Sequence, residues 1–237
     1  MISPRYRRLA EEAFEANLGI PKLGLAILTW GNASAADADL GAFAIKPSGV
    51  AYEDLAVDSM VIVDFEGAVV EGSLNPSSDT PTHAALYRAW TGVGGIVHTH
   101  SPFATSWAQA CSPVPVFGTT HADQSAEPIP CTPYLSEAAV RGDYEAETGK
   151  IIVETLAKLG LSPKDAPMIL VAGHGPFTWG ASAGKALHNA ATLEELCKMA
   201  LCTRVIAPGQ APLPGYIVNK HWERKHGAGA YYGQKGK

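Results

Sequence analysis

The order of its predicted elements limits most strongly what this chain can fold into. Several short strands come as hairpins, and long amphipathic helices interrupt them without a regular strand–helix repeat. Hairpins favour antiparallel pairing, and the missing repeat disfavours a barrel of eight strand–helix units. We therefore expect a mixed, mostly antiparallel sheet covered by helices. The expected strands are Leu25–Thr29, Phe43–Lys46, Met60–Phe65, Ala68–Glu71, a stretch over 94–100, Val114–Phe117, Met168–Ala172 and Phe177–Gly180.

The expected helices follow apolar periodicity and local stop signals. The first ends near Gly19 and Pro21. With 237 residues, 46% of them hydrophobic, the chain is long enough to bury a large core, and we expect one domain over residues 1–237. The expected helices are Pro4–Leu18, one that starts at Thr80, Ser101–Ala110, Asp143–Gly160, Ala183–Ile206 and Gly215–His226.

Charge and hydropathy exclude several classes of partner. The formal net charge is −5 and the 18 lysines and arginines are scattered, so we expect no nucleic-acid partner. The N-terminus has no apolar run behind its basic residues, which disfavours a signal peptide. No stretch reaches about 18 uninterrupted apolar residues, so no membrane helix is expected. We expect a soluble, cytoplasmic protein.

Several reactive side chains are expected to be structural. The four cysteines have no Cys-x-x-Cys spacing, which disfavours both disulfides and thiolate zinc sites. Cys197 and Cys202 lie on a predicted helix and are most simply small core residues. His83 and His188 also lie within predicted helices, without an obvious convergent partner.

Two histidines one residue apart end the stretch 94–100. Side chains alternate along a strand, so His98 and His100 project from one face with Cα atoms roughly 6.5–7 Å apart, close enough to share one cation. Zinc favours neutral imidazole, and a catalytic site uses three protein ligands. His174, which follows the strand 168–172, is a candidate third ligand. The spacing alone leaves open two hydrogen-bonded histidines without a metal.

A well-marked helix start lies near residue 80. Thr80 is the expected N-cap, and Pro81 suits the first helical position because proline has no N–H to leave unpaired. The free N–H groups of such a start attract anions, and Ser77 and Ser78 beside them suit a phosphate. Asp79 is either a hard oxygen ligand or a partner of the helix dipole. The simpler interpretation, a well-capped helix, stays open.

Three classes of function fit such a histidine pair. A metal hydrolase would activate water, but barrel hydrolases carry the pair near the chain start and need a longer chain. A cupin-like binder would be all-β, which the long helices disfavour. A lyase or isomerase would use a cation to polarise a carbonyl. The anion-friendly loops favour this third class, in which Asp123 could exchange protons with a substrate hydroxyl.

Matches to a known family occur, in order, over residues 29–32, 45–50, 76–83, 94–101, 118–123, 129–132, 174–176 and 224–234. With these segments the chain resembles the class II aldolase family, and most closely its L-ribulose-5-phosphate 4-epimerase branch. The resemblance covers nearly the whole chain. It implies an α/β fold, a three-layer α-β-α sandwich whose central sheet is mixed and mostly antiparallel.

The resemblance also implies a site shared by several segments. The cation, usually zinc although another divalent metal is possible, would be held by Asp79, His98, His100 and His174. The substrate would be bound by Gly31, Asn32, Lys46, Ser48, Gly49, Ser77 and Ser78, with Thr119, Glu145 and His221 in supporting positions. Asp123 and Tyr232 would form the acid/base pair. They would act across a subunit boundary in a homotetramer, to which the segment 215–237 contributes.

The implied reaction inverts C4 of a phosphorylated pentulose. L-ribulose 5-phosphate would be cleaved between C3 and C4, and the aldehyde fragment would rotate before the bond reforms, giving D-xylulose 5-phosphate. One alternative is a fuculose- or rhamnulose-phosphate aldolase, whose family members carry Glu where this chain has Asp79. Another is a non-catalytic binding module of this fold. The chain departs from the epimerase pattern at Ala172-Gly173, just before His174.

Overall fold

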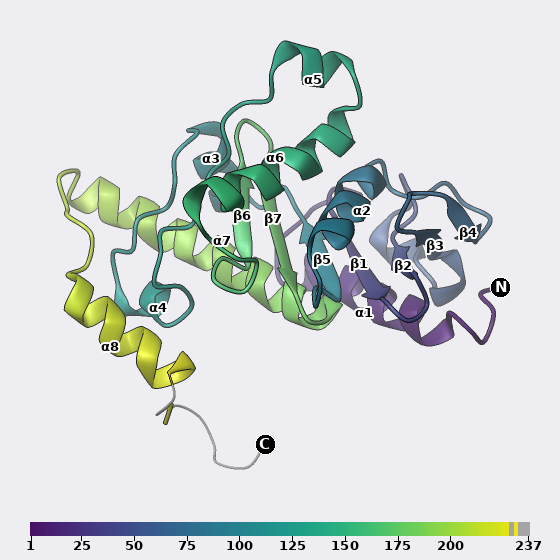
Figure 1. Ribbon diagram of the computed structural model, residues 1–237, viewed down its shortest axis with the longest axis horizontal. Helices are drawn as coiled ribbons and strands as arrows, with labels where there is room; N and C mark the ends of the chain where they lie inside the picture. The colour runs from purple at the N-terminus through teal and green to yellow at the C-terminus, as the bar shows by residue number, and fades with distance from the viewer. Residues whose placement is uncertain (228–229, 232–237) are drawn as a thin grey trace.

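Strands from both halves of the chain form one central sheet with helices on both faces (Figure 1). The computed structural model describes residues 1–227 and 230–231. In chain order the elements are α1 (Arg7–Lys22), β1 (Asn32–Asp37), β2 (Ala42–Ile45), η1 (Tyr52–Asp54), η2 (Val57–Ser59), β3 (Val61–Asp64), β4 (Val69–Glu71), α2 (Thr80–Ala89), β5 (Gly95–His98), α3 (Pro102–Gln109), α4 (Thr119–Ala122), α5 (Glu137–Arg141), α6 (Tyr144–Leu159), β6 (Met168–Val171), β7 (Gly175–Gly180), α7 (Ala183–Ile206) and α8 (Gly215–His226).

The sheet has the strand order β4-β3-β2-β1-β5-β7-β6, and every neighbouring pair is antiparallel. The hairpins β1–β2, β3–β4 and β6–β7 pair strands that are adjacent in sequence, and the sequence predicts the last two of them. Strand β5 joins the two halves of the sheet, since it pairs with both β1 and β7. Within the described part of the chain, the parallel pairing is one isolated bridge between Cys131 and Leu170.

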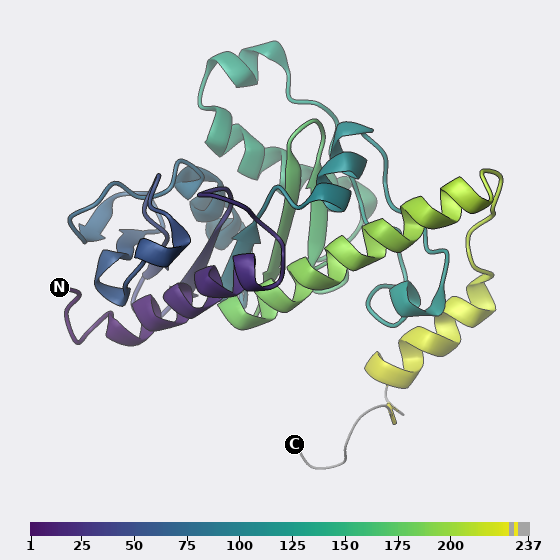
Figure 2. The ribbon, with the colours of Figure 1, turned by 180° about the vertical axis from the view of Figure 1, so that it is seen from behind.

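Two hydrophobic clusters lie on opposite faces of the sheet. Helices α1 and α7 cover one face and α2 and α6 cover the other, as the two opposite views show (Figures 1 and 2). The alternation of side chains along β5 divides its residues between them, because Ile96 belongs to the α2/α6 cluster and Val97 to the α1/α7 cluster. The predicted three-layer α-β-α sandwich is confirmed.

One predicted strand was wrong. Residues 25–29 form bends and turns, and the first strand is instead β1, which occupies part of the stretch between the first two expected strands. Leu28 has a φ of 55° and its side chain is 70% exposed, so this apolar run cannot join the sheet. The small side chains of Ala33 and Ala35 are fully buried on β1 and let α1 pack closely.

Other boundaries also differ from the sequence expectation. Helix α1 continues to Lys22, because burial of Ile20 in its last turn offsets the hydrogen bond that Pro21 removes. The strand predicted at 114–117 is reduced to a bridge between Val114 and Ile129. The segment 118–123, for which no helix was expected, contains the short helix α4. Helices α6, α7 and α8 lie where the sequence predicts them.

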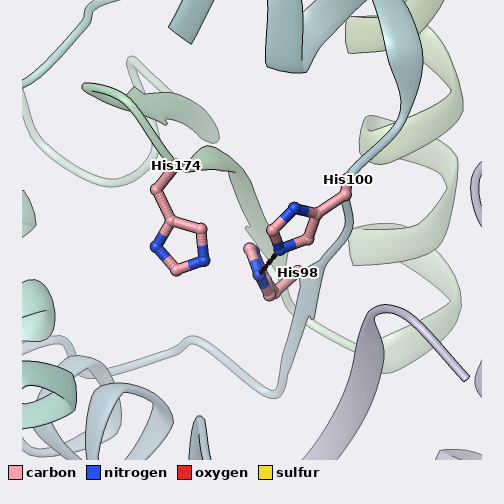
Figure 3. A group of neighbouring side chains, drawn as sticks. All are labelled: His98, His100 and His174. Atoms are coloured by element: carbon pink, nitrogen blue, oxygen red, sulfur yellow. Dashed lines mark hydrogen bonds between the residues drawn. The ribbon is translucent and has the colours of Figure 1, made fainter. Parts of the chain in front are cut away.

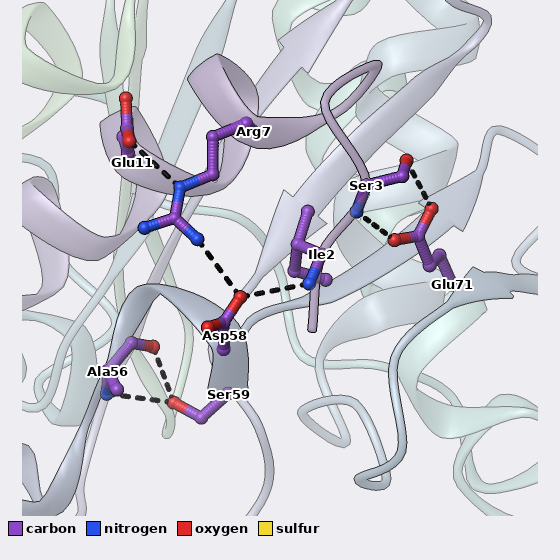
Figure 4. A network of polar contacts seen from close by, with 8 residues as sticks. All are labelled: Ile2, Ser3, Arg7, Glu11, Ala56, Asp58, Ser59 and Glu71. Carbon is purple, nitrogen blue, oxygen red and sulfur yellow. Dashed lines mark hydrogen bonds and ion pairs between the residues drawn. The ribbon is translucent and has the colours of Figure 1, made fainter.

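The N-terminal residues are fastened to the β3–β4 end of the sheet (Figure 4). The Ile2 backbone N–H donates to Asp58 Oδ1 at 2.9 Å, and the Arg7 guanidinium reaches the same oxygen at 3.0 Å. Ser3 Oγ donates to Glu71 Oε2 at 2.8 Å. The ion pair is half exposed and contributes little alone. The burial of Ile2 and the hydrogen bonds to its neighbours together fix the start of the chain.

All four cysteines are free thiols. Cys197 is buried in the α7 core, as expected, whereas Cys202 on the same helix is exposed, so the expectation that it lies in the core was wrong. No helix among the described residues is long and apolar enough to cross a membrane.

Replacing Gly95 by alanine should destabilise the fold. A Cβ at this position on β5 would lie 2.3 Å from backbone atoms of Ala183, where α7 begins, and backbone cannot move aside without disturbing the helix. We expect the free energy of unfolding to fall by about 1–3 kcal/mol or more, measured by urea denaturation. Gly209→Ala, at a position with open space, is the control and should stay within about 0.5 kcal/mol of the parent.

Candidate metal centre and substrate cavity

Three histidines converge at the ends of two neighbouring strands (Figure 3). His98 ends β5, His100 lies two residues beyond it, and His174 lies in the turn between β6 and β7. Their ring centroids are 4.8 to 5.1 Å apart, and one ligand nitrogen of each lies within 4.8 Å of the others. The sequence predicts this convergence, although His100 lies beyond the end of the strand.

The distance between His98 and His100 suits a shared cation. Their Nε2 atoms lie 3.1 Å apart. A tetrahedral zinc ion with Zn–N bonds of about 2.0–2.1 Å separates its ligand nitrogens by about 3.3 Å. Two imidazole nitrogens at this spacing, with His174 beside them, therefore fit a zinc-like cation.

The fold sets the orientation of the His98 ring. Its Nδ1 lies 2.9 Å from Pro176 O, an acceptor, so the proton sits on Nδ1 and the Nε2 lone pair faces the other two histidines. The ring also stacks on Phe177 at 4.2 Å between centroids and 17° between planes. Both partners come from β7, so the strand pairing that forms the sheet also orients this imidazole.

Burial favours neutral imidazoles in this cluster. It lowers the pKa of His174 to about 4, helped by the neighbouring His98 and His100, and it also lowers the pKa of His100. A neutral imidazole has the free lone pair that a metal needs. Tyr144 places its hydroxyl 3.2 Å from His174 Nδ1 and fixes the ring from the other side.

Asp79 adds a carboxylate beside the histidines. It is the N-cap of α2, and the expectation that Thr80 would cap this helix was wrong, because Thr80 is the first helical residue and its hydroxyl donates to Ser77 O at 2.6 Å. Burial would raise the pKa of Asp79, but His98, His83 and the hydrogen bond from Asn32 Nδ2 at 2.6 Å hold it below its usual range. Asp79 therefore stays ionised next to the cluster.

A cavity of about 540 Å³ opens over this cluster. Its walls come from the loop before β1 and the first residue of that strand, the loops after β2 and β4, and the start of α6. Twelve of the predicted site residues line it: Gly31, Asn32, Lys46, Ser48, Gly49, Ser77, Ser78, Asp79, His98, His100, Glu145 and His174. Residues that are scattered over more than half the chain are thus brought to one place.

Two loops form the end of the cavity that carries the hydroxyls. The Ser48 N–H donates to Asn75 O at 2.9 Å and the Ser77 N–H donates to Lys46 O at 3.0 Å, so the loops support each other. Gly31 needs a glycine, because its φ is 80° and a Cβ would lie 2.8 Å from His98 O.

Lys46 brings a positive charge to these loops. Its side chain is 2% exposed, its Nζ lies 3.4 and 3.5 Å from the carbonyl oxygens of Thr29 and Pro47, and burial lowers its pKa. The Nζ also lies 5.1 Å from the centre of the Tyr52 ring. An ammonium group next to serine hydroxyls is suited to an anion such as a phosphate.

Asp123 is not among the residues that line this cavity. It caps the end of α4, and its carboxylate accepts hydrogen bonds from His221 Nδ1 at 3.0 Å and Arg224 Nε at 2.9 Å on α8. Burial would raise the pKa of Asp123, but these two residues and Lys225 lower it. Thr119 also lies on α4 outside the cavity, and Tyr232 lies outside the described residues.

Comparison with known proteins identifies the fold and family. The sequence model for the Class II Aldolase and Adducin N-terminal domain matches residues 11–201. The chain belongs to this family. Proteins named L-ribulose-5-phosphate 4-epimerase UlaF, from Salmonella paratyphi A and Salmonella typhi, are 53% identical to this class II aldolase family member over 229 residues. That alignment covers 97% of this chain and 100% of theirs.

Solved structures of the class II aldolase family share the fold. An L-fuculose 1-phosphate aldolase superposes with a TM-score of 0.76 at 22% identity, over 94% of this chain and 97% of its own. A putative aldolase/epimerase/decarboxylase, YgbL from Klebsiella pneumoniae, superposes with a TM-score of 0.70 at 24% identity, over 90% and 97% of the two chains. At these identities the likeness shows the fold alone.

Sequence reasoning missed Tyr144 in this family member. The residue is half buried in the cavity wall, and burial together with Asp79 and Glu145 raises its pKa, so the hydroxyl keeps its proton. The signal available in the sequence is its position, directly after the N-cap Asp143 and before Glu145. His83 is buried on α2 and does have partners, Ser34 and, through it, Tyr87.

Acidification should destabilise the metal-free protein between about pH 6.5 and pH 4. Burial lowers the pKa of both His121 and His174 from 6.5 to about 4, so the folded state binds fewer protons than the unfolded chain in this window. The free energy of unfolding should therefore fall as the pH drops from 7 to 5, measured by urea denaturation. The lowered pKa values of Asp79 and Asp123 act below this window.

A His121→Asn variant isolates one of these groups. It should be less stable than the parent at pH 7, because it disturbs a buried contact to Glu127 O, yet lose less stability between pH 7 and pH 5. An equal loss in the variant and the parent would contradict the assignment to His121.

Proposed function

We propose that this chain is a metal-dependent L-ribulose-5-phosphate 4-epimerase that inverts C4 by retro-aldol cleavage and recondensation, giving D-xylulose 5-phosphate. The observation that carries the proposal is one cavity in which three histidines and a carboxylate face loops bearing serine hydroxyls and a buried lysine. The names of the 53% identical relatives support the same reaction. A phosphorylated pentulose is the proposed substrate. Because such anions do not diffuse across membranes, an enzyme that acts on them is expected where they form, and we place it in the cytoplasm.

The cation ligands of the proposal are His98, His100, His174 and Asp79, and the proposed cation is zinc. The three histidines, whose ligand nitrogens lie within 4.8 Å of one another, fit zinc and its neighbours, and the ionised Asp79 carboxylate beside them is proposed as the fourth ligand. When bound, the cation supplies a Lewis acid that stabilises negative charge on the ketose oxygens during cleavage. The chain itself orients the imidazoles, through Pro176 O for His98 and Tyr144 for His174.

The loops hold the phosphate end of the substrate in this proposal. Ser48, Ser77 and Ser78 offer hydroxyls and N–H groups, and Lys46 neutralises the charge. Gly31 and Gly49 let the backbone approach the ligand, and Asn32 links the loop to Asp79. With the phosphate at one end and the histidines at the other, C3 and C4 lie near the cation site.

The proton transfers are assigned to Asp123 and Tyr232 of a neighbouring subunit. Asp123 does not line the cavity of its own chain, so a second copy must supply it if it acts there. The C-terminal half of α7 exposes apolar side chains, including Val205 at 73% and Ile206 at 84%, which suits a subunit contact. A homotetramer in which the segment 215–237 completes the site of a neighbour satisfies both observations, with Thr119 and His221 beside Asp123.

A sugar-phosphate aldolase of the same family is the second candidate, because the fold matches an L-fuculose 1-phosphate aldolase. Asp79 favours the epimerase, since aldolase members carry the longer Glu at this position. The two reactions share cleavage and differ in whether the fragments leave. A non-catalytic binding module would have no need for a complete set of imidazole ligands beside the phosphate loops.

Removing the cation should abolish turnover. We expect NMR spectra of L-ribulose 5-phosphate with the enzyme to show D-xylulose 5-phosphate, and a chelator to stop its formation until Zn²⁺ is added back. His100→Ala should lose both bound metal and activity, whereas His188→Asn, on α7 outside the cavity, should keep both. Accumulation of free aldehyde in place of xylulose 5-phosphate would favour the aldolase, and turnover unaffected by complete metal removal would sink both candidates.

Asp123→Asn and Tyr232→Phe should slow epimerisation by about 10²–10⁴-fold while leaving metal content unchanged, because they remove proton transfer and not a ligand. Steady-state rates and metal analysis of the purified variants measure the two effects separately. An unchanged rate would remove the substituted residue from the proton transfer.

Mixing two inactive variants tests the subunit boundary. Asp123→Asn subunits keep the histidines, and His174→Ala subunits keep Asp123, so a mixed tetramer regains complete sites at its interfaces. Random equal mixing in a ring should restore about a quarter of the sites. Mixed tetramers verified by native mass spectrometry that stay inactive would place the acid/base groups and the histidines in the same chain.

A further inference from the structure

One buried tyrosine contacts two of the segments that form the serine-bearing end of the cavity. Tyr52 is 5% exposed and begins η1, four residues beyond Ser48. Its hydroxyl donates to Trp30 O at 2.7 Å and to Gly31 O at 3.1 Å. The Lys46 Nζ lies 5.1 Å from the centre of its ring. Tyr52 therefore joins the loop before β1 to the lysine that follows β2.

The phenol acts as a hydrogen-bond donor to this loop. Its one proton is shared between two carbonyl oxygens, of which Trp30 O is the nearer. Burial raises the pKa of Tyr52, so the hydroxyl keeps this proton at neutral pH. Both carbonyl groups are thereby drawn to the buried side of the loop. A carbonyl dipole that points into the cavity would repel an anion, and Tyr52 prevents this for Trp30 and Gly31.

The same hydrogen bond sets the direction of the Gly31 N–H. The Trp30–Gly31 peptide is trans, and in a planar trans peptide the N–H points opposite to the C=O. Since Trp30 O faces Tyr52, the Gly31 N–H points away from it. Gly31 lines the cavity and Tyr52 does not, so this N–H is directed to the cavity side. It has no hydrogen-bond partner in the described part of the chain.

Two further N–H groups of the cavity wall are in the same condition. Gly49 and Ser78 line the cavity, and within residues 1–227 and 230–231 no partner accepts from either N–H. Together with Gly31 they bring three unpaired backbone donors from three separate loops to the neighbourhood of the Lys46 ammonium group. Backbone N–H groups that converge in this way are typical of anion sites.

The ring of Tyr52 acts on the charge of this end of the cavity. A cation within about 6 Å of an aromatic centre is attracted to the ring face, and Lys46 Nζ is within that distance. Burial lowers the pKa of Lys46 and so favours loss of its proton. The ring opposes this effect, because it stabilises only the charged form. It also fixes the ammonium group beside the loop that carries Gly31.

We propose that Tyr52 is a positioning residue for the anion-binding end of the cavity: its hydroxyl turns the Gly31 N–H toward the ligand, and its ring holds the Lys46 ammonium group in place. This inference rests on the proposed function, because it takes the substrate phosphate as the natural ligand of these loops. Tyr52 touches no reacting atom and acts only through its two neighbours.

Binding of inorganic phosphate, measured by calorimetry on the metal-loaded protein, tests the proposal apart from turnover. Tyr52→Phe removes the hydroxyl and keeps the ring, so it should bind phosphate about 3–10-fold more weakly than the parent. Tyr52→Leu also removes the ring and should lose a further factor of about 2–30. If Tyr52→Leu does not fold, Tyr52→Phe still decides the role of the hydroxyl.

Tyr6 provides matched controls. It is 7% exposed, belongs to the same hydrophobic cluster as Tyr52, and has the Arg5 guanidinium 5.1 Å from its ring centre. Tyr6→Phe and Tyr6→Leu therefore make the same two changes in the same core, away from the cavity. Both variants should bind phosphate as the parent does.

Two further measurements respond to positioning and not to general loosening. In NMR spectra of the Zn²⁺-loaded protein, inorganic phosphate should shift the Gly31 amide proton downfield, and this shift should be reduced in Tyr52→Phe but retained in Tyr6→Phe. Steady-state kinetics of Tyr52→Phe should show a raised KM for L-ribulose 5-phosphate with kcat nearly unchanged, because the lost interaction is made equally before and during the reaction.

The outcomes separate two kinds of failure. A parent protein that does not convert L-ribulose 5-phosphate would overturn the proposed function, while phosphate binding would still decide the role of Tyr52. A parent that binds phosphate, together with Tyr52 variants of parental affinity, would overturn the positioning role alone. A Gly31 amide that does not respond to bound phosphate, or equal losses of affinity in the Tyr52 and Tyr6 variants, would also overturn it.

Discussion

The pairing of β5 with β7 is the contact on which the site depends. In its register His98 stands opposite Phe177, and the imidazole both stacks on that ring and donates to the carbonyl of Pro176. The turn that begins β7 carries His174. A slip of one residue would move His98 to the face covered by α1 and α7 and separate the cluster. The same hydrogen bonds therefore determine both the sheet and the histidine geometry.

The α2/α6 face of the sheet is where the polar residues gather. Asn32 and Ser34 leave β1 on this face, since Ala33 and Ala35 between and after them belong to the opposite cluster. Helix α2 packs there with its N-terminus toward the strand ends, so Asp79 arrives beside Asn32. Asn32 and Asp79 therefore meet because the packing of β1 and α2 brings them together. The hydrophobic packing and the hydrogen bond between these two side chains favour the same arrangement.

Several helices could be predicted from the sequence, because long runs of helix-forming residues or clear cap and stop residues mark them. Helix α7 follows from its Leu/Ala-rich composition, the proline-rich connection 208–214 separates it from α8, and α6 is bounded by its cap residues Asp143 and Gly160. Strand β1 was missed because its alanines and serine resemble a turn until α1 is packed against them. Tyr144 and the contacts of Asp123 depend on how distant helices dock, and no local pattern encodes docking.

The surroundings of Lys46 have a further consequence. Lys46 is almost fully buried, and among the residues that the structure describes its side-chain partners are two carbonyl oxygens and the Tyr52 ring, with no ion pair to a carboxylate. A buried charge without a counter-ion is a local cost to folding. An anion bound between the loops would pair with this ammonium group and remove that cost. The buried charge lowers the stability of the ligand-free protein. Because an anion relieves this destabilisation when it binds, the same charge increases the affinity and selectivity for a negatively charged ligand.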